Sequence, residues 1–295
     1  MKRTVTVRLL PDKDAEARLK ALCSLSSKLW NEVNYARRRM FFETKRVDLK
    51  GTYREFYEKY KTLIGSATAQ QILNKNDESW RSFFSLLKAK KEGKLPSFMN
   101  RISPPGYRKR GGIRVLWTVL RNDQYRIDND YVVIRGLGAI GSLRIRFSGR
   151  IHIIGKQGRA EIRYDADEKK WYMHVSFEVE EKIVRDKRAR VPMKPLGDKI
   201  AGIDIGINNL LAVYVDDGSA LLVSGRPLKS ISFYWRSKIA RYQSTLNRYG
   251  LKTSKRLRIM YKKWRRRIKD YINWVVRNAV EWLYYKGVRR IVVGY

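Results

Sequence analysis

The chain of 295 residues carries 65 lysines and arginines against 28 aspartates and glutamates, which gives a formal net charge of +37. So many positive charges repel one another unless a polyanion neutralises them, so the composition indicates a nucleic-acid-binding protein. Hydrophobic residues make up 43% of the chain, which excludes a disordered basic tail, and the absence of a long apolar run or signal peptide predicts a cytoplasmic protein without a membrane partner.

The chain begins with a predicted strand and continues with predicted helices. Residues 3–10 alternate apolar and polar side chains, as a half-buried strand does. Apolar residues then recur at steps of three and four over residues 14–45, and similar blocks cover 53–60 and 66–93. We therefore expect residues 12–94 to form a helical insert.

A basic loop and a run of strands follow the helical insert. Residues 95–112 contain three prolines and three glycines among basic residues, which is typical of a loop. The segments after it alternate and are interrupted by Asn, Asp and Gly, and residues 165–170 form the expected turn of a hairpin. Residues 1–11 and 95–195 are thus predicted to build a β-barrel into which the helices are inserted.

The last third of the chain has a different order of elements. A basic linker over residues 181–198 leads to three short strands within 200–224, two helical blocks within 228–287, and an apolar strand over 289–294 that we expect to be buried. Three strands, helix and parallel-type strand form the first half of an RNase H-like domain. The predicted fold is α+β and multidomain, with residues 196–295 as a partial RNase H-like α/β domain.

Asp204 is the candidate residue for metal chemistry. It stands in the apolar string IAGIDIGI, where an unpaired carboxylate would be costly. A bound Mg²⁺ or Mn²⁺ ion removes that cost, and Gly202 and Gly206 leave room for a phosphate or an ion. The alternative is that Asp204 caps a turn or pairs with a lysine.

Zinc is not expected in this chain. The sequence has a single cysteine, Cys23, which excludes a Cys-based zinc site. The two histidines, His152 and His174, lie in strand-like stretches and are expected to be side chains on a sheet face rather than metal ligands.

Basic residues are densest over residues 252–269. So many like charges at helical spacing destabilise a helix that lacks an anionic partner, although an ordinary solvated helix face is the alternative. The predicted phosphate contacts are Lys252, Lys255, Arg256, Arg258, Lys262, Lys263, Arg265, Arg266, Arg267 and Lys269. A second predicted group lies in the basic loop, namely Tyr107, Arg108, Lys109 and Arg110.

Two further sets of residues lie in the predicted helical insert. Asn and Gln pair well with adenine edges, so four amides are candidates for base reading: Gln70, Gln71, Asn74 and Asn76. Trp80, Phe83 and Phe84 are expected in the core rather than as platforms for bases.

Several segments resemble the TnpB (OrfB) family of insertion-sequence nucleases, relatives of the type V CRISPR effectors. AGIDIGINNLLAVYVDDGS resembles the family's first RuvC motif. NDESWRSFFSLLK, PPGYRKRGG, YDADEKKWYMHVSFEVEE and the segment from KRLRIMYKKW to RRIVVG match in the same order. The likeness covers essentially the whole chain.

The resemblance implies an RNA-guided DNA endonuclease. A guide RNA would lie between a wedge-type β-barrel, a helical recognition insert and a RuvC domain, and would pair with double-stranded target DNA. Asp204 would be the first catalytic, metal-binding residue. The family checks a short DNA motif in the region of the helical insert.

The family also needs later acidic residues and a four-cysteine zinc module, which would follow Tyr295. Asp216 and Asp217 read as a hairpin turn, and Glu281 as an ordinary helix residue. We therefore expect weak or no cleavage by this chain alone, as a remnant, a non-cleaving binder or one part of a nuclease completed by a second polypeptide. The exposed edge of an apolar last strand favours a remnant or a split partner. A generic basic RNA-binding protein is the alternative from another class.

Overall fold

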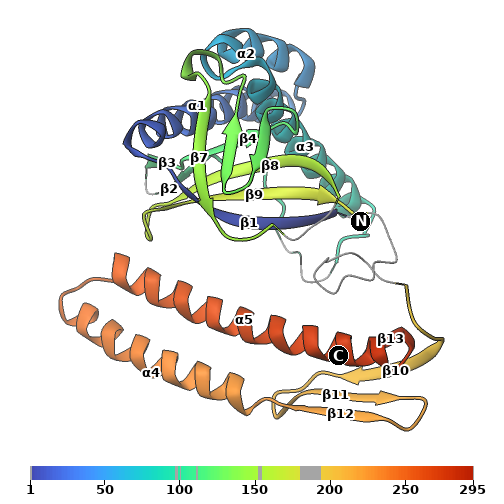
Figure 1. Cartoon of the computed structure of the whole chain (residues 1–295). Coiled ribbons are helices and arrows are strands. Elements are labelled where there is room, and N and C mark those ends of the chain that lie inside the picture. The colour runs from blue at the N-terminus through green and yellow to red at the C-terminus, as the bar shows by residue number, and fades with distance from the viewer. Residues whose placement is uncertain are drawn as a thin grey trace. The chain divides into compact units, whose positions relative to one another are not determined.

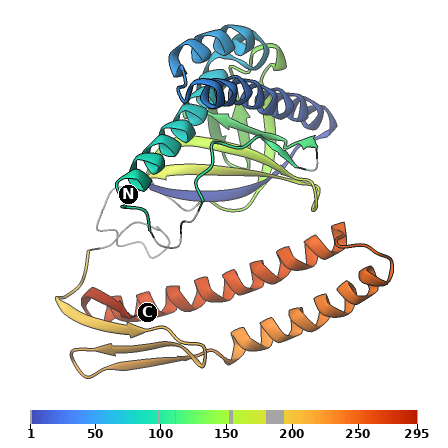
Figure 2. The same ribbon diagram turned by 180° about the vertical axis from the view of Figure 1, so that it is seen from behind.

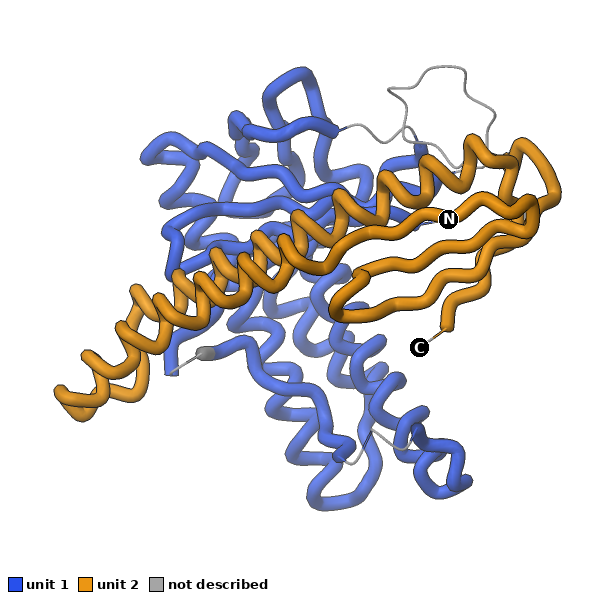
Figure 3. Tube along the Cα trace, turned by 90° about the horizontal axis from the view of Figure 1, so that it is seen from below, with its two compact units in different colours: residues 1–191 blue, residues 192–295 orange. Residues whose placement is uncertain are grey.

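The computed structural model describes residues 2–96, 99, 101–110, 112–151, 155–179 and 194–294. The chain divides into two compact units, residues 1–191 and 192–295 (Figure 3). His152 and most of the predicted linker lie outside the described residues. None of the described helices has the length and apolar character needed to cross a bilayer.

Unit 1 contains the three predicted helices. They are α1 (Lys13–Thr44), α2 (Leu49–Ile64) and α3 (Ser66–Lys91), so the predicted helical blocks are confirmed. Asp12 and Asp48 cap the first two helices, because each carboxylate accepts a hydrogen bond from a backbone N–H of the first turn.

The strands of unit 1 form a seven-stranded antiparallel sheet in the order β4-β8-β9-β1-β7-β6-β5. They are β1 (Lys2–Leu10), β4 (Trp117–Leu120), β5 (Tyr125–Asp128), β6 (Tyr131–Ile134), β7 (Leu143–Ser148), β8 (Lys156–Asp165) and β9 (Lys170–Glu178). A small hairpin of β2 (Lys109–Arg110) and β3 (Ile113–Arg114) precedes β4, and a 3₁₀ turn, η1 (Gly138–Ile140), precedes β7.

The first strand lies between β9 and β7, which confirms that the N-terminal strand joins the later sheet. Among the described strands, no pairing joins β4 to β5, so closure into a barrel stays a prediction. His174 of β9 is half-buried, and its Nδ1 lies 2.8 Å from Thr6 Oγ1 of β1, in agreement with the expected position on a sheet face.

Helices and sheet share one hydrophobic core in unit 1. The three helices lie together on one side of the sheet (Figure 1). Leu19, Leu22 and Trp30 of α1 are buried with Trp117 and Met173 of the sheet. Trp80 and Phe83 are also buried and contact Phe84, so the expectation that these rings serve the core is confirmed.

A buried arginine joins the three helices. The Arg37 guanidinium is fully buried and bonds Asp77 at 2.6 Å, Asn76 Oδ1 at 2.7 Å and Thr52 Oγ1 at 2.9 Å. Burial lowers the pKa of Arg37, and the Asp77 carboxylate opposes that shift. A buried charge of this kind is tolerated because it is paired and hydrogen-bonded.

Unit 2 holds a four-stranded sheet and a helical hairpin. Its elements are β10 (Lys199–Asp204), β11 (Asn209–Val215), β12 (Ala220–Ser224), α4 (Arg226–Arg248), α5 (Lys255–Tyr285) and β13 (Val288–Gly294). The strand order is β12-β11-β10-β13, with β10 antiparallel to β11 and parallel to β13. The predicted order of three strands, helices and a parallel strand is confirmed, and α4 and α5 run antiparallel beyond the sheet (Figure 2).

Helix α5 covers only one face of this sheet. Val275, Ala279 and Leu283 of α5 are buried with Ala201 and Val213 of the strands. The prediction that the last strand is buried is wrong, because β13 lies at the sheet edge and every residue of it after Val288 is exposed.

Candidate nucleic-acid interface and acidic strand end

Asp204 is the last residue of β10, and its side chain is exposed. In the sheet it is paired with Ala212 of β11 and Gly294 of β13. The expectation that this carboxylate lies inside an apolar strand is wrong, because at the strand end solvent can bear its charge. Its candidacy as a metal ligand therefore rests on the family motif and not on a cost of burial.

The sheet face that carries Asp204 is open at Gly202. A side-chain carbon at Gly202 would meet no atom within 4 Å, so packing does not require a glycine there. Gly206 differs, because a side-chain carbon there would lie 2.8 Å from the carbonyl oxygen of Asn209. The turn after β10 thus explains Gly206, while the space beside Gly202 is free for a ligand.

The other acidic residues considered in unit 2 have structural partners. Asp216 accepts a hydrogen bond from the Ile200 backbone N–H at 2.9 Å. Asp217 pairs with Lys199 at 2.7 Å, and this hydrogen bond holds the pKa of Asp217 well below its usual range. Glu281 bonds Arg277 at 2.8 Å, as expected for a helix residue. Within the described parts of the chain, no three His, Cys, Asp or Glu side chains lie close enough to hold a metal ion.

The predicted basic helix is α5, which begins at Lys255, so Lys252 lies in the loop before it. The side of α5 that packs on α4 carries Leu257, Met260 and Trp264. The rest of the helix surface carries a set of exposed cations, here named the α5 basic face. Its members are Lys255, Arg256, Lys263, Arg265, Arg266, Arg267 and Lys269. Arg258 and Lys262 are half-buried.

Aromatic rings hold part of this helix in place. Trp264 lies 6.3 Å from Tyr261, centre to centre, and packs with Trp235 and Tyr242 of α4. The Arg256 guanidinium lies 5.0 Å from the centre of the Tyr242 ring. Trp264 is therefore a packing residue of the hairpin, while its neighbours Lys263 and Arg265 are exposed.

Helix α4 adds cations that the sequence analysis did not single out. Arg236, Lys238 and Arg241 are exposed on α4, which packs against α5 through Ile239 and Leu246. In the sequence, these three cations follow one another at steps of two and three residues around the apolar Ile239, and this pattern could have indicated a second basic helix. The hairpin, rather than α5 alone, is the basic element of unit 2.

The basic loop of unit 1 lines a hollow of about 590 Å³ next to α3. Arg108 lies between two rings, with its guanidinium carbon 4.5 Å from the centre of Trp30 and 4.2 Å from that of Trp117. Burial, and next the charge of Arg163, lower the pKa of Arg108. This geometry assigns Arg108 a packing role, whereas Lys109 is exposed and Tyr107 half-buried.

The four candidate amides of α3 occupy different environments. Asn76 is fully buried and accepts a hydrogen bond from Arg37, so in this conformation it presents no edge to a base. Gln70 accepts a hydrogen bond from Arg121 at 3.2 Å. Asn74 is exposed and Gln71 half-exposed. Gln71 lies one turn before Lys75, which lines the hollow.

Comparison with known proteins adds sequence and fold relationships. A family model of OrfB from IS605, described as a probable transposase, matches residues 174–295. The TnpB-like protein ORF457 of Acidianus two-tailed virus is 39% identical over 314 residues, which cover 99% of this chain and 68% of that protein.

The fold is similar to that of a solved protein. The structure of the Cas12f1-sgRNA-target DNA complex contains a chain that matches with a TM-score of 0.56 at 11% identity, over 99% of this chain and 80% of that one. At this identity the likeness concerns the fold alone, a mixed α/β arrangement with antiparallel sheets.

Proposed function

The chain belongs to the TnpB family of transposase-associated proteins, and we propose that it binds a guide RNA and, through it, double-stranded target DNA. The observation that carries the proposal is the α5 basic face, a set of exposed cations along one helix in a chain of this family. Cations so arranged suit a phosphate backbone, while base pairing by a guide supplies sequence reading. The family relationship favours this function over that of a generic basic RNA-binding protein.

The architecture supports an assignment of parts. The seven-stranded sheet of unit 1 corresponds to the wedge-type barrel, α1–α3 to the recognition insert, and unit 2 to the first half of a RuvC domain. The support for the last assignment is the topology of unit 2, in which β13 runs parallel to β10 after two helices. Asp204 then lies at the carboxyl end of the strand that is central to this topology.

Asp204 suits one ligand position of a Mg²⁺ or Mn²⁺ ion. Its exposed carboxylate and the open space at Gly202 leave room for an ion and a phosphate. Such an ion, when bound, would activate water and stabilise the leaving oxygen of a phosphodiester. Among the described residues, no cluster of three potential ligands surrounds such an ion, and the Asp204 carboxylate is the one ligand proposed here. Further ligands must come from the substrate or from other protein segments, such as a second polypeptide. A polypeptide of these 295 residues would thus bind nucleic acid and cleave it weakly or not at all.

Unit 1 would meet the DNA at α3 and the basic loop. Gln71 and Asn74 are the two amides with accessible edges, and Lys109 adds an exposed cation. The hollow between α3 and the loop is lined by Lys75, Ser79 and Tyr107, which offer hydrogen-bond donors to a nucleic acid. We assign these residues, together with Gln70, to contacts that position or read the DNA.

Sequencing of the RNA that copurifies with the chain from its native host, after a high-salt wash, tests the proposal. We expect one discrete RNA that maps beside the gene of this protein. Bulk ribosomal or random RNA would contradict guide binding and favour a generic RNA-binding protein.

Cleavage is tested separately with pure chain, this RNA, Mg²⁺ and a matching DNA. Asp204→Ala should leave the affinity for the RNA unchanged. A strong Mg²⁺-dependent cut by the wild-type chain that Asp204→Ala abolishes would contradict the proposal of weak cleavage.

A further inference from the structure

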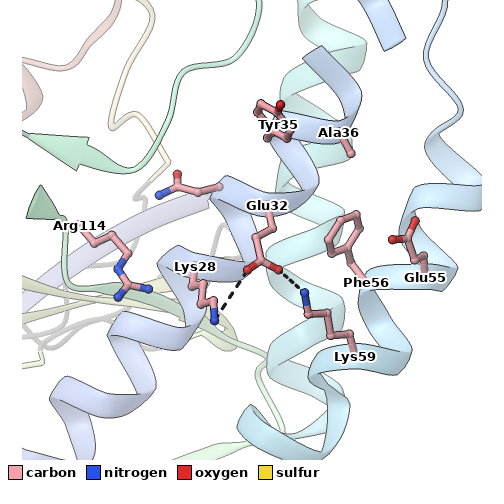
Figure 4. Close-up of a pocket in the computed structure, with 9 residues that line it drawn as sticks. Lys28, Glu32, Tyr35, Ala36, Glu55, Phe56, Lys59 and Arg114 are labelled. Carbon is pink, nitrogen blue, oxygen red and sulfur yellow. Dashed lines mark hydrogen bonds and ion pairs between the residues drawn. The ribbon is translucent and has the colours of Figure 1, made fainter. Parts of the chain in front are cut away.

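A second hollow in unit 1 belongs to none of the sites above. It has a volume of about 420 Å³ and opens between α1, α2 and the end of β3 (Figure 4). Its lining includes Lys28, Glu32, Tyr35, Phe56, Lys59 and Arg114. Its size falls within the range of ~300–1,000 Å³ that is usual for small-ligand pockets.

The centre of the hollow is a carboxylate between two ammonium groups. Lys59 Nζ lies 2.8 Å from one oxygen of Glu32, and Lys28 Nζ lies 3.8 Å from the other, as Figure 4 shows. Partial burial alone would raise the pKa of Glu32, but the hydrogen bond from Lys59 and the two positive charges lower it overall. The hollow therefore presents the order donor, acceptor, donor.

Lys59 and Glu32 make further contacts with the protein around the hollow. The Lys59 ammonium lies 5.9 Å from the centre of the Phe56 ring, and Phe56 is buried between the helices. The Glu32 side chain is 28% exposed, so its oxygens are partly shielded but accessible.

The rim of the hollow provides a ring and a further cation. The Tyr35 residue is 61% exposed. Arg114 is exposed on β3 and reaches toward the hollow from the opposite side (Figure 4). A ring on one side of a hollow and a cation on the other can hold a base by stacking and the neighbouring phosphate by charge.

We propose that this hollow binds one unpaired uracil or thymine base of a single strand. The pairing edge of these bases runs O4, N3–H, O2, which is acceptor, donor, acceptor, the complement of Lys28, Glu32 and Lys59. Cytosine and guanine would place an amino group against an ammonium, and adenine would place the N1 lone pair against the carboxylate. The inference rests on the proposed nucleic-acid binding and adds a base preference to it.

Binding of labelled 12-residue oligonucleotides to the full chain tests this site. Fluorescence anisotropy at about 0.3 M salt, where phosphate contacts are weakened, would compare U12, dT12, C12 and A12. We expect U12 or dT12 to bind about tenfold more tightly than C12 and A12. A tighter complex with U12 than with dT12 identifies RNA as the source of the base, and the reverse identifies DNA.

Variants locate the preference. Glu32→Gln should bring the ratio of U12 to C12 affinity close to one, whereas Glu43→Gln, on the same helix and paired with Arg39, should keep it. Tyr35→Ala should weaken U12 binding about tenfold, and the exposed Tyr249 supplies the matched control Tyr249→Ala. Thermal melting of each variant confirms that it is folded.

The outcomes separate this inference from the proposed function. Equal affinity of the wild-type chain for U12 and C12, or an unchanged ratio in Glu32→Gln, overturns the site. Failure to bind any oligonucleotide even at low salt contradicts the proposed function instead. Photocrosslinking of the wild-type chain to a 4-thiouridine 12-mer needs no variant, and adducts should lie in the peptide with Tyr35. Adducts found only elsewhere overturn the inference.

Discussion

The two units of this protein use their positive charges in different ways. In unit 1, the Arg37 guanidinium is buried against Asp77, Arg108 lies between two tryptophans, and Arg159 bonds Glu78. In unit 2, residues 252–269 contain ten basic residues and no acidic one, and most of these cations are exposed. A basic composition alone therefore does not tell which cations hold the fold and which are left for a polyanion. Burial against carboxylates and rings marks the structural cations of unit 1, and exposure marks the candidates for a polyanion in unit 2.

The largest expected effect is the loss of the buried cation of unit 1. Arg37→Met keeps the side-chain volume but leaves the Asp77 carboxylate and Asn76 without their partner, which should lower the free energy of unfolding by ~3–5 kcal/mol. Urea titration followed by tryptophan fluorescence measures the change. Arg39→Met on the same helix, with its exposed pair to Glu43, should have no measurable effect. Equal stability of both variants would remove the structural role assigned to Arg37.

Next in size is the loss of cations from the α5 basic face. Lys263→Gln, Arg265→Gln and Arg267→Gln together should weaken nucleic-acid binding and lower the slope of log affinity against log salt by about two to three. Removal of like charges should leave the helix at least as stable. The matched control is Lys45→Gln, Arg46→Gln and Lys50→Gln, which are also exposed and lie outside α3 and the basic loop. If both triple variants lose the same affinity, the charge acts through the whole surface and not through α5.

The sequence predicted most helices and strands of this protein but not how exposed its last strand is. Period-three-to-four and period-two patterns located the helices and most strands, because these patterns follow directly from which side chains face a core. That the first strand joins the later sheet was inferred from a single alternating segment, whereas its neighbours β7 and β9 were not predicted. Whether β13 is buried was beyond the pattern, since an apolar strand looks the same at a sheet edge as at its centre.

Site residues were harder to predict than elements. A run of basic residues has the same sequence whether its partners are rings, carboxylates or phosphates. Arg108 was therefore predicted to contact phosphate, although its guanidinium packs between Trp30 and Trp117. Asn76 was predicted as a candidate for base contact because its hydrogen bond with Arg37 joins two helices and is not visible in the local sequence. The hollow around Glu32 combines residues from three elements, and no local motif announces it.

Arg108 offers a sharper and smaller test of the comparison. Arg108→Leu removes a cation that is largely desolvated between two rings, and should lower the stability of unit 1 by ~1–2 kcal/mol. The salt dependence of nucleic-acid binding should stay unchanged, because the guanidinium is not free to meet a phosphate. A stable Arg108→Leu variant with a reduced salt slope would place Arg108 among the binding cations and blur the distinction between the units.

The smallest expected effect concerns pH and touches unit 1 alone. Burial, and next the charge of Arg163, lower the pKa of His174, so the unfolded chain takes up its proton at a higher pH than the folded chain does. The stability of the surrounding sheet should therefore fall as the pH drops through the ordinary histidine range near ~6.5. Both histidines of the sequence precede residue 192, so unit 2 should show no such loss.

Hydrogen exchange of the full chain between pH 7 and pH 5, corrected for the intrinsic pH dependence of exchange, measures both units in one sample. Protection of β1 and β9 should decrease toward pH 5 in the wild-type chain and change less in His174→Gln, which keeps a polar partner for Thr6. Protection of β10 and β11 should be the same in both proteins. An equal loss of protection in β10 and β11 would mean that the two units do not unfold independently. The stability of unit 2 would then depend on the internal partners of unit 1, and the contrast between the units would not extend to their stability.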